Sequence, residues 1–268
     1  MSSEPTYLYY PDGRVESEEW YQDGVLHRVD GPALIGYYED GRVMCKDWYR
    51  DGARHRDDGP AHIDYHEDGS VACEEWWLFD NYYRDNAPAD VTYYKNGIIE
   101  RECWYKVGEL SRDGAPAYVK YYEDGSIKQE IWYQKGRTHR DDEPAVTTYY
   151  PNGHIMREGW YQKGKLHRDG GPAETWYQED GTIKREEWYQ DGKYHREDGP
   201  AITEYREDGS LDREYWYQDG KKHRVDGPAC TIYREDGSTG LEEWWQDGEP
   251  VEPPSRVDVS AQDMGVEL

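Results

Sequence analysis

The sequence has few of the residues from which a thick globular core is built. Only 35% of its 268 residues are apolar, and a single Phe stands beside 27 Tyr and 12 Trp. Leu, Ile and Val are sparse, whereas amphipathic aromatic rings suit a thin layer in which one end of each ring meets water. The composition therefore favours one elongated, thin array over a large compact domain.

Cysteine is also scarce. The four cysteines, Cys45, Cys73, Cys103 and Cys230, show neither CxxC spacing nor the density of a disulfide scaffold. Cys45 and Cys73 occupy the same repeat position one period apart, so we expect free thiols, which suit a reducing cytoplasm. No apolar run approaches membrane-spanning length, and the N-terminus lacks a basic stretch and an apolar h-region. We expect a soluble, cytoplasmic protein without a membrane span.

Positive charge is in deficit. The 32 basic residues face 58 acidic ones, which gives a formal net charge of -26. Such a charge disfavours binding to nucleic-acid phosphates and to anionic membranes, and it permits a basic partner. A simpler explanation is that a repeat rich in solvent-facing Glu and Asp accumulates charge by copy number.

The most regular feature that is present is a tryptophan every 28 residues. A fixed period of this size is typical of repeat architectures, in which each unit buries its apolar face only by stacking on its neighbours. We predict that these tryptophans are the structural anchors of about nine copies: Trp20, Trp48, Trp76, Trp104, Trp132, Trp160, Trp188, Trp216 and Trp244.

A glycine stands seven residues before each of these tryptophans, preceded by Asp or Asn in every copy. Such a pair between alternating strands is a strong hairpin signal, because both residues tolerate the positive φ of a two-residue type I′ turn. At Asp40-Gly41 this turn places Ala33 opposite Trp48. Alanine recurs at that position in each later unit, so a small residue faces a large ring.

In most copies the tryptophan is followed by a second glycine turn, such as Asp51-Gly52, and then by a segment of the form HRxDGPA. An even number of strands per unit lets each unit follow the last by the same rotation and shift. We therefore predict two strands per repeat, with HRxDGP as a connecting arc. The predicted fold is all-β, an elongated array of antiparallel hairpins in a twisted single-layer sheet. A lead-in at residues 1–6 precedes the array at 7–248, and an acidic, Pro-containing tail at 249–268 is predicted to be disordered or capping.

Two charged positions recur with the repeat. Guanidinium and carboxylate groups pair in bidentate geometry and tolerate partial burial, so we predict a structural ion-pair ladder. A feature copied eight times is not an active site, and we expect no catalytic residues and no enzyme. The ladder positions are Arg28, Arg56, Arg84, Arg112, Arg140, Arg168, Arg196 and Arg224 with Glu74, Glu102, Glu130, Glu158, Glu186 and Glu214. Glu18 and Glu242 occupy the same repeat position as these glutamates.

Metal and cofactor sites are not predicted. Equivalent histidines two strands apart are separated by about 10 Å, which is too far to share one zinc ion. The Asp-Gly turns lack the spaced ligands of a calcium loop. Nucleotide-binding and hydrolase motifs are absent. Stacked aromatic platforms for single-stranded nucleic acid are interleaved with Lys and Arg, whereas acids dominate here, so direct nucleic-acid binding is not expected.

Two units are irregular. Residues 78–83 (LFDNYY) and 106–111 (KVGELS) place Tyr83 and Ser111 where other units have histidine. These units either form a bend or binding spot or reflect drift in a tolerant repeat. The C-terminal tail is a second open case, since it either caps the array or serves as a docking peptide.

The unit from Tyr121 to Ala145, YYEDGSIKQEIWYQKGRTHRDDEPA, resembles the bacterial variant of the MORN repeat (membrane occupation and recognition nexus). The resemblance covers about residues 7–248. The unit is longer than usual, and Arg140 stands where the family has a glycine after histidine. The matching residues are Tyr121, Tyr122, Asp124, Gly125, Glu130, Trp132, Tyr133, Gly136 and His139.

This resemblance implies an elongated, twisted sheet of hairpins that binds proteins or lipids, and some bacterial relatives are described as antitoxins. It implies no catalytic residues. We expect a non-enzymatic protein-interaction scaffold that binds a basic protein, and the antitoxin or immunity type is one form that it can take. One alternative is an acidic nucleic-acid mimic that inhibits a DNA-binding protein. Another is a self-assembling, filament-forming protein, because hairpin arrays have free terminal strands that can pair end to end.

Overall fold

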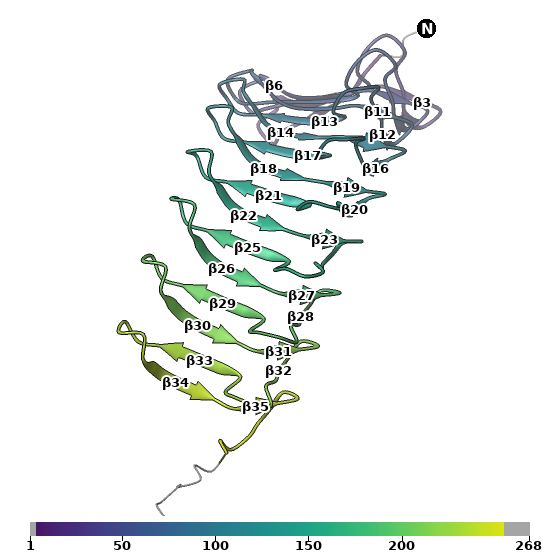
Figure 1. Cartoon of the computed structure of the whole chain (residues 1–268). Coiled ribbons are helices and arrows are strands. Elements are labelled where there is room, and N and C mark those ends of the chain that lie inside the picture. The colour runs from purple at the N-terminus through teal and green to yellow at the C-terminus, as the bar shows by residue number, and fades with distance from the viewer. Residues whose placement is uncertain (1–3, 255–268) are drawn as a thin grey trace, which may run out of the picture.

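Figure 1 shows a computed structural model of the chain, which describes residues 4–254. Within this range the regular structure consists of strands, with no helix. Eighteen longer strands form one antiparallel sheet, and each pairs with its neighbours in chain order. Every repeat supplies two of them, so the predicted all-β array of hairpins is confirmed. The period of 28 residues and the even number of strands per repeat were both predicted from the sequence.

The strands of the main sheet are β1 (Thr6–Tyr9), β2 (Val15–Glu19), β5 (Leu34–Tyr37), β6 (Val43–Asp47), β9 (His62–Tyr65), β10 (Val71–Glu75), β13 (Asp90–Tyr93), β14 (Ile99–Cys103), β17 (Tyr118–Tyr121), β18 (Ile127–Ile131), β21 (Val146–Tyr149), β22 (Ile155–Gly159), β25 (Glu174–Tyr177), β26 (Ile183–Glu187), β29 (Ile202–Tyr205), β30 (Leu211–Tyr215), β33 (Cys230–Tyr233) and β34 (Thr239–Glu243).

Each repeat also contains a short two-stranded hairpin, where only a glycine turn was predicted. A repeat therefore has two long and two short strands. The short strands are β3 (Tyr21–Gln22), β4 (Val25–Leu26), β7 (Tyr49–Arg50), β8 (Ala53–Arg54), β11 (Trp77–Leu78), β12 (Asn81–Tyr82), β15 (Tyr105–Lys106), β16 (Glu109–Leu110), β19 (Tyr133–Gln134), β20 (Arg137–Thr138), β23 (Tyr161–Gln162), β24 (Lys165–Leu166), β27 (Tyr189–Gln190), β28 (Lys193–Tyr194), β31 (Tyr217–Gln218), β32 (Lys221–Lys222), β35 (Trp245–Gln246) and β36 (Glu249–Pro250).

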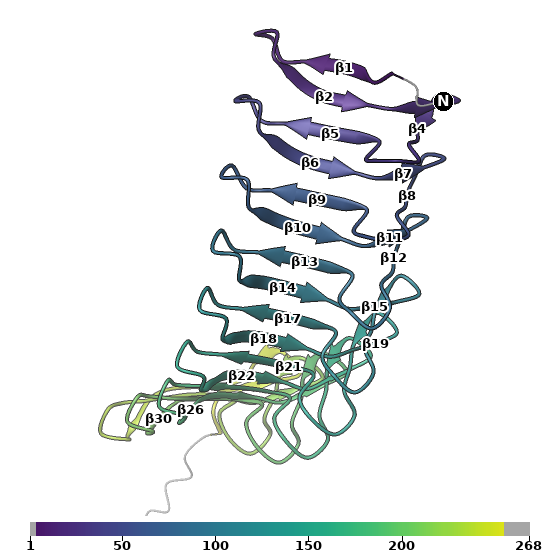
Figure 2. The ribbon, with the colours of Figure 1, turned by 90° about the horizontal axis from the view of Figure 1, so that it is seen from above.

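The sheet twists strongly along its length. The hairpins from β18 to β34 face the viewer in Figure 1, while the sheet of the N-terminal repeats is seen edge-on, with the repeats overlapping. After the 90° turn of Figure 2 the N-terminal hairpins face the viewer instead. In both views the turns between long strands lie along one edge, here called the turn edge. The short hairpins and the HRxDGP arcs lie along the opposite edge, here called the arc edge.

The turns along the turn edge differ from the predicted type I′. At Asp40-Gly41 only the glycine has a positive φ, +85°. The Gly41 amide donates to the Tyr38 carbonyl at 2.8 Å, and the register shifts between Gly36 and Tyr37, so the turn contains an extra residue and a bulge. Asp40 keeps a negative φ and its carboxylate accepts the Arg42 amide at 3.0 Å. The predicted two-residue turn was therefore wrong here.

The type I′ turns occur in the short hairpins instead. Both Asp51 and Gly52 have positive φ, at +53° and +80°. The two-residue loop joins strands of only two residues each. Matching the right-handed twist of such a short ladder requires this turn type.

The core is thin and follows the alanines. The predicted register is confirmed, since Leu34 pairs with Asp47 and Ile35 with Lys46, which brings Ala33 level with Trp48. Alanines at this position are at most 1% exposed in all eight repeats that have them. In the eight repeats from Trp20 to Trp216 the tryptophan amide donates to the alanine carbonyl of the next repeat, as Trp48 does to Ala61 at 2.8 Å. A larger side chain has no room at the alanine position.

The array extends from Thr6 to Pro250, and most of the predicted tail, residues 255–268, lies outside the described residues. All four cysteines are free, as expected. Within residues 4–254, no helix is long and apolar enough to cross a membrane.

Candidate functional site

The recurring arginines lie on the tryptophan rings. In each arc the chain bends back, and the guanidinium carbon stands 3.6 to 4.2 Å from the ring centroid of the tryptophan eight residues earlier. Arg28 also donates to the Pro32 carbonyl at 3.2 Å, a bond that recurs in most repeats. The pairs are Arg28–Trp20, Arg56–Trp48, Arg84–Trp76, Arg112–Trp104, Arg140–Trp132, Arg168–Trp160, Arg196–Trp188 and Arg224–Trp216. The arginine and tryptophan of each repeat therefore form one cation–π stack.

The recurring glutamates have a different partner from the one predicted. Every one except Glu242 accepts a hydrogen bond from a tyrosine hydroxyl 19 residues later, in the next repeat. The pairs are Tyr37–Glu18, Tyr93–Glu74, Tyr121–Glu102, Tyr149–Glu130, Tyr177–Glu158, Tyr205–Glu186 and Tyr233–Glu214, at 2.6 to 3.2 Å. In the one repeat with lysine instead, the Lys46 ammonium stands 5.5 Å from the Tyr65 ring centroid.

The predicted Arg–Glu ladder is thus replaced by two ladders. Among residues 4–254, no direct ion pair joins the predicted arginines to the predicted glutamates. The arginines instead contact exposed carboxylates of their own arcs, as Arg56 does with Asp58 at 3.0 Å. Burial and the hydrogen bond to Glu18 raise the pKa of Tyr37 to about 12, so the hydroxyl stays a donor at neutral pH. Spacing alone could place these residues on one face but could not choose between arginine and tyrosine as the partner.

The arc histidines join neighbouring repeats. In five repeats the backbone amide of the type I′ turn donates to the Nδ1 of the histidine in the preceding arc, at 3.1 to 3.3 Å. The pairs are Asp51–His27, Lys163–His139, Asp191–His167, Asp219–His195 and Asp247–His223. Each of these five histidines therefore bridges one pair of neighbouring repeats, whereas His55 stands 3.1 Å from Asp57 of its own arc.

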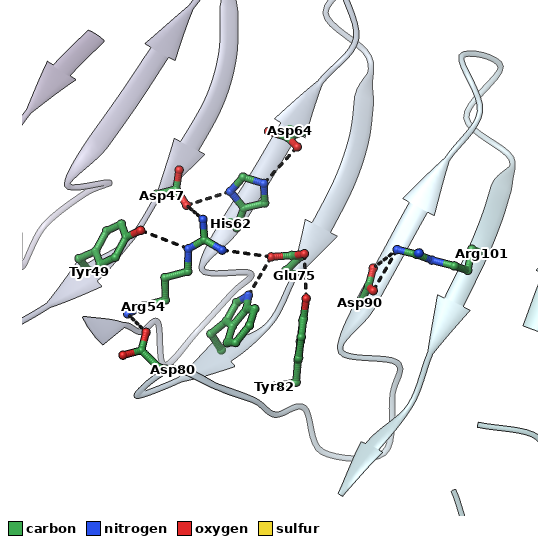
Figure 3. A network of polar contacts seen from close by, with 11 residues as sticks. Asp47, Tyr49, Arg54, His62, Asp64, Glu75, Asp80, Tyr82, Asp90 and Arg101 are labelled. Carbon is green, nitrogen blue, oxygen red and sulfur yellow. Dashed lines mark hydrogen bonds and ion pairs between the residues drawn. The ribbon is translucent and has the colours of Figure 1, made fainter. Parts of the chain in front are cut away.

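A polar network that sequence reasoning missed covers the sheet face under the short hairpins in the second to fourth repeats (Figure 3). His62 bridges Asp47 at 2.8 Å and Asp64 at 3.1 Å. Arg54, from β8, reaches Asp47 at 3.1 Å and Glu75 at 3.5 Å. The sequence feature that could have predicted this network is the series of charged residues at alternate positions of successive strands. In a single-layer sheet such residues can also face solvent.

One group in this network has the residue types of a metal site. Ligand atoms of Cys73, Glu75 and Asp90 lie within 4.8 Å of one another. However, Glu75 already accepts bonds from Trp77 and Tyr82, and Asp90 is held by Arg101 at 2.9 Å. Burial raises the pKa of Asp90 and Arg101 opposes that rise. Because arginine already supplies the positive charge, the group is an ion-pair network and gives no support to a cation site.

The arc edge carries a row of exposed carboxylates. One to three carboxylates follow the arginine of every arc, and their side chains are 60% to 88% exposed where they form ion pairs. Successive arcs are about 10 Å apart, because two strands separate them. These acids include Asp30, Asp57, Asp58, Asp113, Asp141, Glu143, Asp169, Glu197, Asp198 and Asp226.

A hollow of about 560 Å³ lies on the arc edge at the two irregular units. Trp104, Tyr105 and Tyr83 line it together with Val107, and Asp85 and Asp113 lie at its rim. An equivalent hollow of about 410 Å³ lies two repeats earlier, so the irregular units differ in the residues around the hollow and not in its presence. Val107 is 95% exposed and has a φ of +50°, which a β-branched residue rarely adopts. The equivalent Phe79 is 57% exposed with a φ of +48°. Exposed apolar side chains held in strained turns point to a contact surface.

The fold and the arc edge together define a class, a non-globular all-β repeat array with an acidic rim. No family model matches the chain, and no curated protein matches it. Among solved structures, it is similar to alternansucrase in complex with isomaltononaose, at 12% identity over 92% of this chain and 16% of that chain, with a TM-score of 0.21. It is also similar to choline binding protein F from Streptococcus pneumoniae, at 13% identity over 94% and 100%, with a TM-score of 0.18. Scores this low carry no argument about function.

Proposed function

We propose that this chain is a MORN-like, non-enzymatic scaffold of the cytoplasm that binds a basic partner protein, in the manner of an antitoxin or immunity protein. The observation that carries the proposal is the row of exposed carboxylates along the arc edge. Taken together, the arcs hold more carboxylates than arginines, and each of these arginines is stacked on its tryptophan. Arg50 and Lys106 of the short hairpins also pair with Asp57 and Asp113. A partner with lysines and arginines on a matching surface is attracted and oriented by this row.

The hollow at the irregular units supplies the anchor. Rim charges steer association and contribute little to affinity, whereas apolar and aromatic side chains in a central pocket contribute most. Tyr83, Tyr105 and Val107 form such a centre, with Asp85 and Asp113 beside it. An arginine or lysine of the partner fits here, with its aliphatic part against the rings and its charge against the carboxylates.

The nucleic-acid mimic receives no support from the distribution of acids. A mimic needs carboxylates in two outer rows at phosphate-like spacing. Here Glu74 and its equivalents are bound to tyrosines on one face, Asp47 and Asp90 are buried on the other, and further aspartates close the turns.

The test is affinity capture from the native source, followed by titration of the captured basic protein against charge variants. Asp85→Asn with Asp113→Asn removes two charges at the hollow, and we expect about tenfold weaker binding at low salt. Asp124→Asn with Asp208→Asn makes the same charge change on the turn edge. Asparagine already stands at the equivalent Asn96 and Asn152, so this control keeps the fold and the affinity.

Val107→Lys separates binding from stability. Lys135 and Lys163 occupy the equivalent position with φ of +50° and +52°, so lysine fits the turn. We expect a fold at least as stable and a larger loss of binding than with the aspartate variants. Capture of nothing above background at low salt, or equal affinity for wild type and Val107→Lys, contradicts the proposal.

A further inference from the structure

The two ends of the main sheet expose strands with apolar side chains. Among the described residues, β1 pairs only with β2, and β34 pairs only with β33. Tyr7, Leu8 and Tyr9 of β1 are 43%, 46% and 57% exposed, and Leu241 of β34 is 46% exposed. Edge strands are usually protected by charge, proline or a covering element. These two carry apolar side chains where protection is expected.

The repeat itself defines how the two ends fit. Inside the array, β30 pairs with β33 through Arg213↔Ile232, Glu214↔Thr231 and Tyr215↔Cys230. The same pairing recurs from one repeat to the next, with both residue numbers larger by 28 at each step. Continuing the series by one period past β34 places Leu241 opposite Leu8 of a second copy, and Glu242 opposite its Tyr7. No like-charged pair arises at this register, and the two exposed leucines cover each other.

Side-chain bonds continue across the same junction. Tyr233 donates to Glu214 at 2.6 Å, and Glu242 stands one period after Glu214, where the hydroxyl of Tyr9 from a second copy reaches it. Arg206 donates through Nη1 to the Leu211 carbonyl and through Nη2 to the Tyr233 carbonyl. Arg234, one period after Arg206, makes the first of these bonds, to the Thr239 carbonyl. By the same repeat, the carbonyl of Tyr9 in a second copy takes the position that the Tyr233 carbonyl has for Arg206.

We propose that β34 of one copy pairs with β1 of a second copy in the register that joins successive repeats, so that the array continues across the junction. The contact is heterologous, because different surfaces meet, and repeated addition extends it into a fibre. Copies of net charge -26 repel one another. Association therefore strengthens as ionic strength rises, which is opposite to the salt dependence expected for a basic partner.

The experiment measures sedimentation of the full chain over a wide concentration range at low and high salt. Leu8→Lys and Leu241→Glu each leave a charge at the junction, and we expect each to raise the dissociation constant about tenfold. Both changes are compatible with the fold, because other repeats have charged residues at these positions. Lys120 and Asp64 are equivalent to Leu8, and Arg101 is equivalent to Leu241. Val29→Lys, on the arc edge, is the matched control and leaves association unchanged.

A mixture of the two single variants decides the geometry. In a head-to-tail contact the lysine of one variant meets the glutamate of the other, so the mixture recovers hetero-association. A chain carrying both changes recovers self-association. Loss of association with Leu8→Lys but not with Leu241→Glu indicates symmetric β1–β1 pairing and overturns the proposal. Monomers at every concentration and salt overturn it as well.

Discussion

His62 is expected to remain protonated far above neutral pH. It lies between Asp47 and Asp64 on the sheet face under the short hairpins (Figure 3). Burial on its own lowers the pKa of a histidine, but the hydrogen bonds to the two carboxylates outweigh it and raise the pKa of His62 to about 10. Asp47 is the dominant partner, because its side chain is buried whereas that of Asp64 is half exposed.

The sign of the pH dependence follows from this pKa. A group whose pKa is higher in the folded state stabilises that state fully below its unfolded value, here 6.5, and loses the contribution as pH rises toward 10. The interval between the two values corresponds to an upper bound of about 5 kcal/mol. Partial solvation of the site reduces the expected contribution to about 2 kcal/mol.

The assay compares the free energy of unfolding of wild type and His62→Gln by urea denaturation between pH 6.5 and pH 10. The difference between the two proteins should shrink by about 2 kcal/mol over this range. NMR titration of the ring protons reports the pKa of His62 directly. Asp47→Asn should lower that pKa strongly, and Asp64→Asn should lower it less.

Two results refute the reasoning. One is a ring titration near the ordinary histidine pKa in wild type. The other is a difference in unfolding free energy between wild type and His62→Gln that does not change with pH, because then the imidazolium contributes nothing to the folded state.

Two further predictions test the joins between repeats and the thin core. Tyr177→Phe removes the bond to Glu158 and should lower the free energy of unfolding by about 1 kcal/mol. Tyr9→Phe is the equivalent change in the first hairpin, which has no preceding repeat, and it should have no effect in dilute solution. Equal effects of the two changes contradict the tyrosine–glutamate ladder. Ala173→Val overfills a site with no exposed surface and should lower the free energy of unfolding, measured by urea denaturation, by about 1 to 3 kcal/mol. Ala53→Val, on the half-buried strand β8, should lower it less. An Ala173→Val protein as stable as wild type contradicts the packing argument.

The sequence predicted the features that depend on the backbone. The period of the tryptophans and the position of Asp40-Gly41 were sufficient to predict the hairpin register, because a sheet restricts pairing to a few alternatives. The type of that turn was not predictable from the pair alone. Asp-Gly suits both a two-residue turn and a longer one with a bulge, and the Asp40 carboxylate favours the longer form by accepting the Arg42 amide.

The contacts of the charged side chains were harder to predict. Arg28 and Glu18 lie on the same face, but guanidinium binds equally well to a ring or a carboxylate, and the fold of the arc decides which it meets. The buried network around His62 was missed for a related reason. The short hairpins that cover it consist of two-residue strands, which leave no alternating pattern in the sequence.

The bonds that join neighbouring repeats have one consequence for how such a chain changes over generations. Tyrosine and glutamate are always 19 residues apart, turn amide and histidine 24, and tyrosine hydroxyl and tyrosine carbonyl 27. None of these bonds reaches past the adjacent repeat. Unequal recombination that removes or duplicates a 28-residue segment therefore leaves these donors with acceptors of the same kind wherever the neighbouring repeats have the regular residues. The length of the array, and with it the length of its acidic edge, is free to vary by whole units while the fold persists.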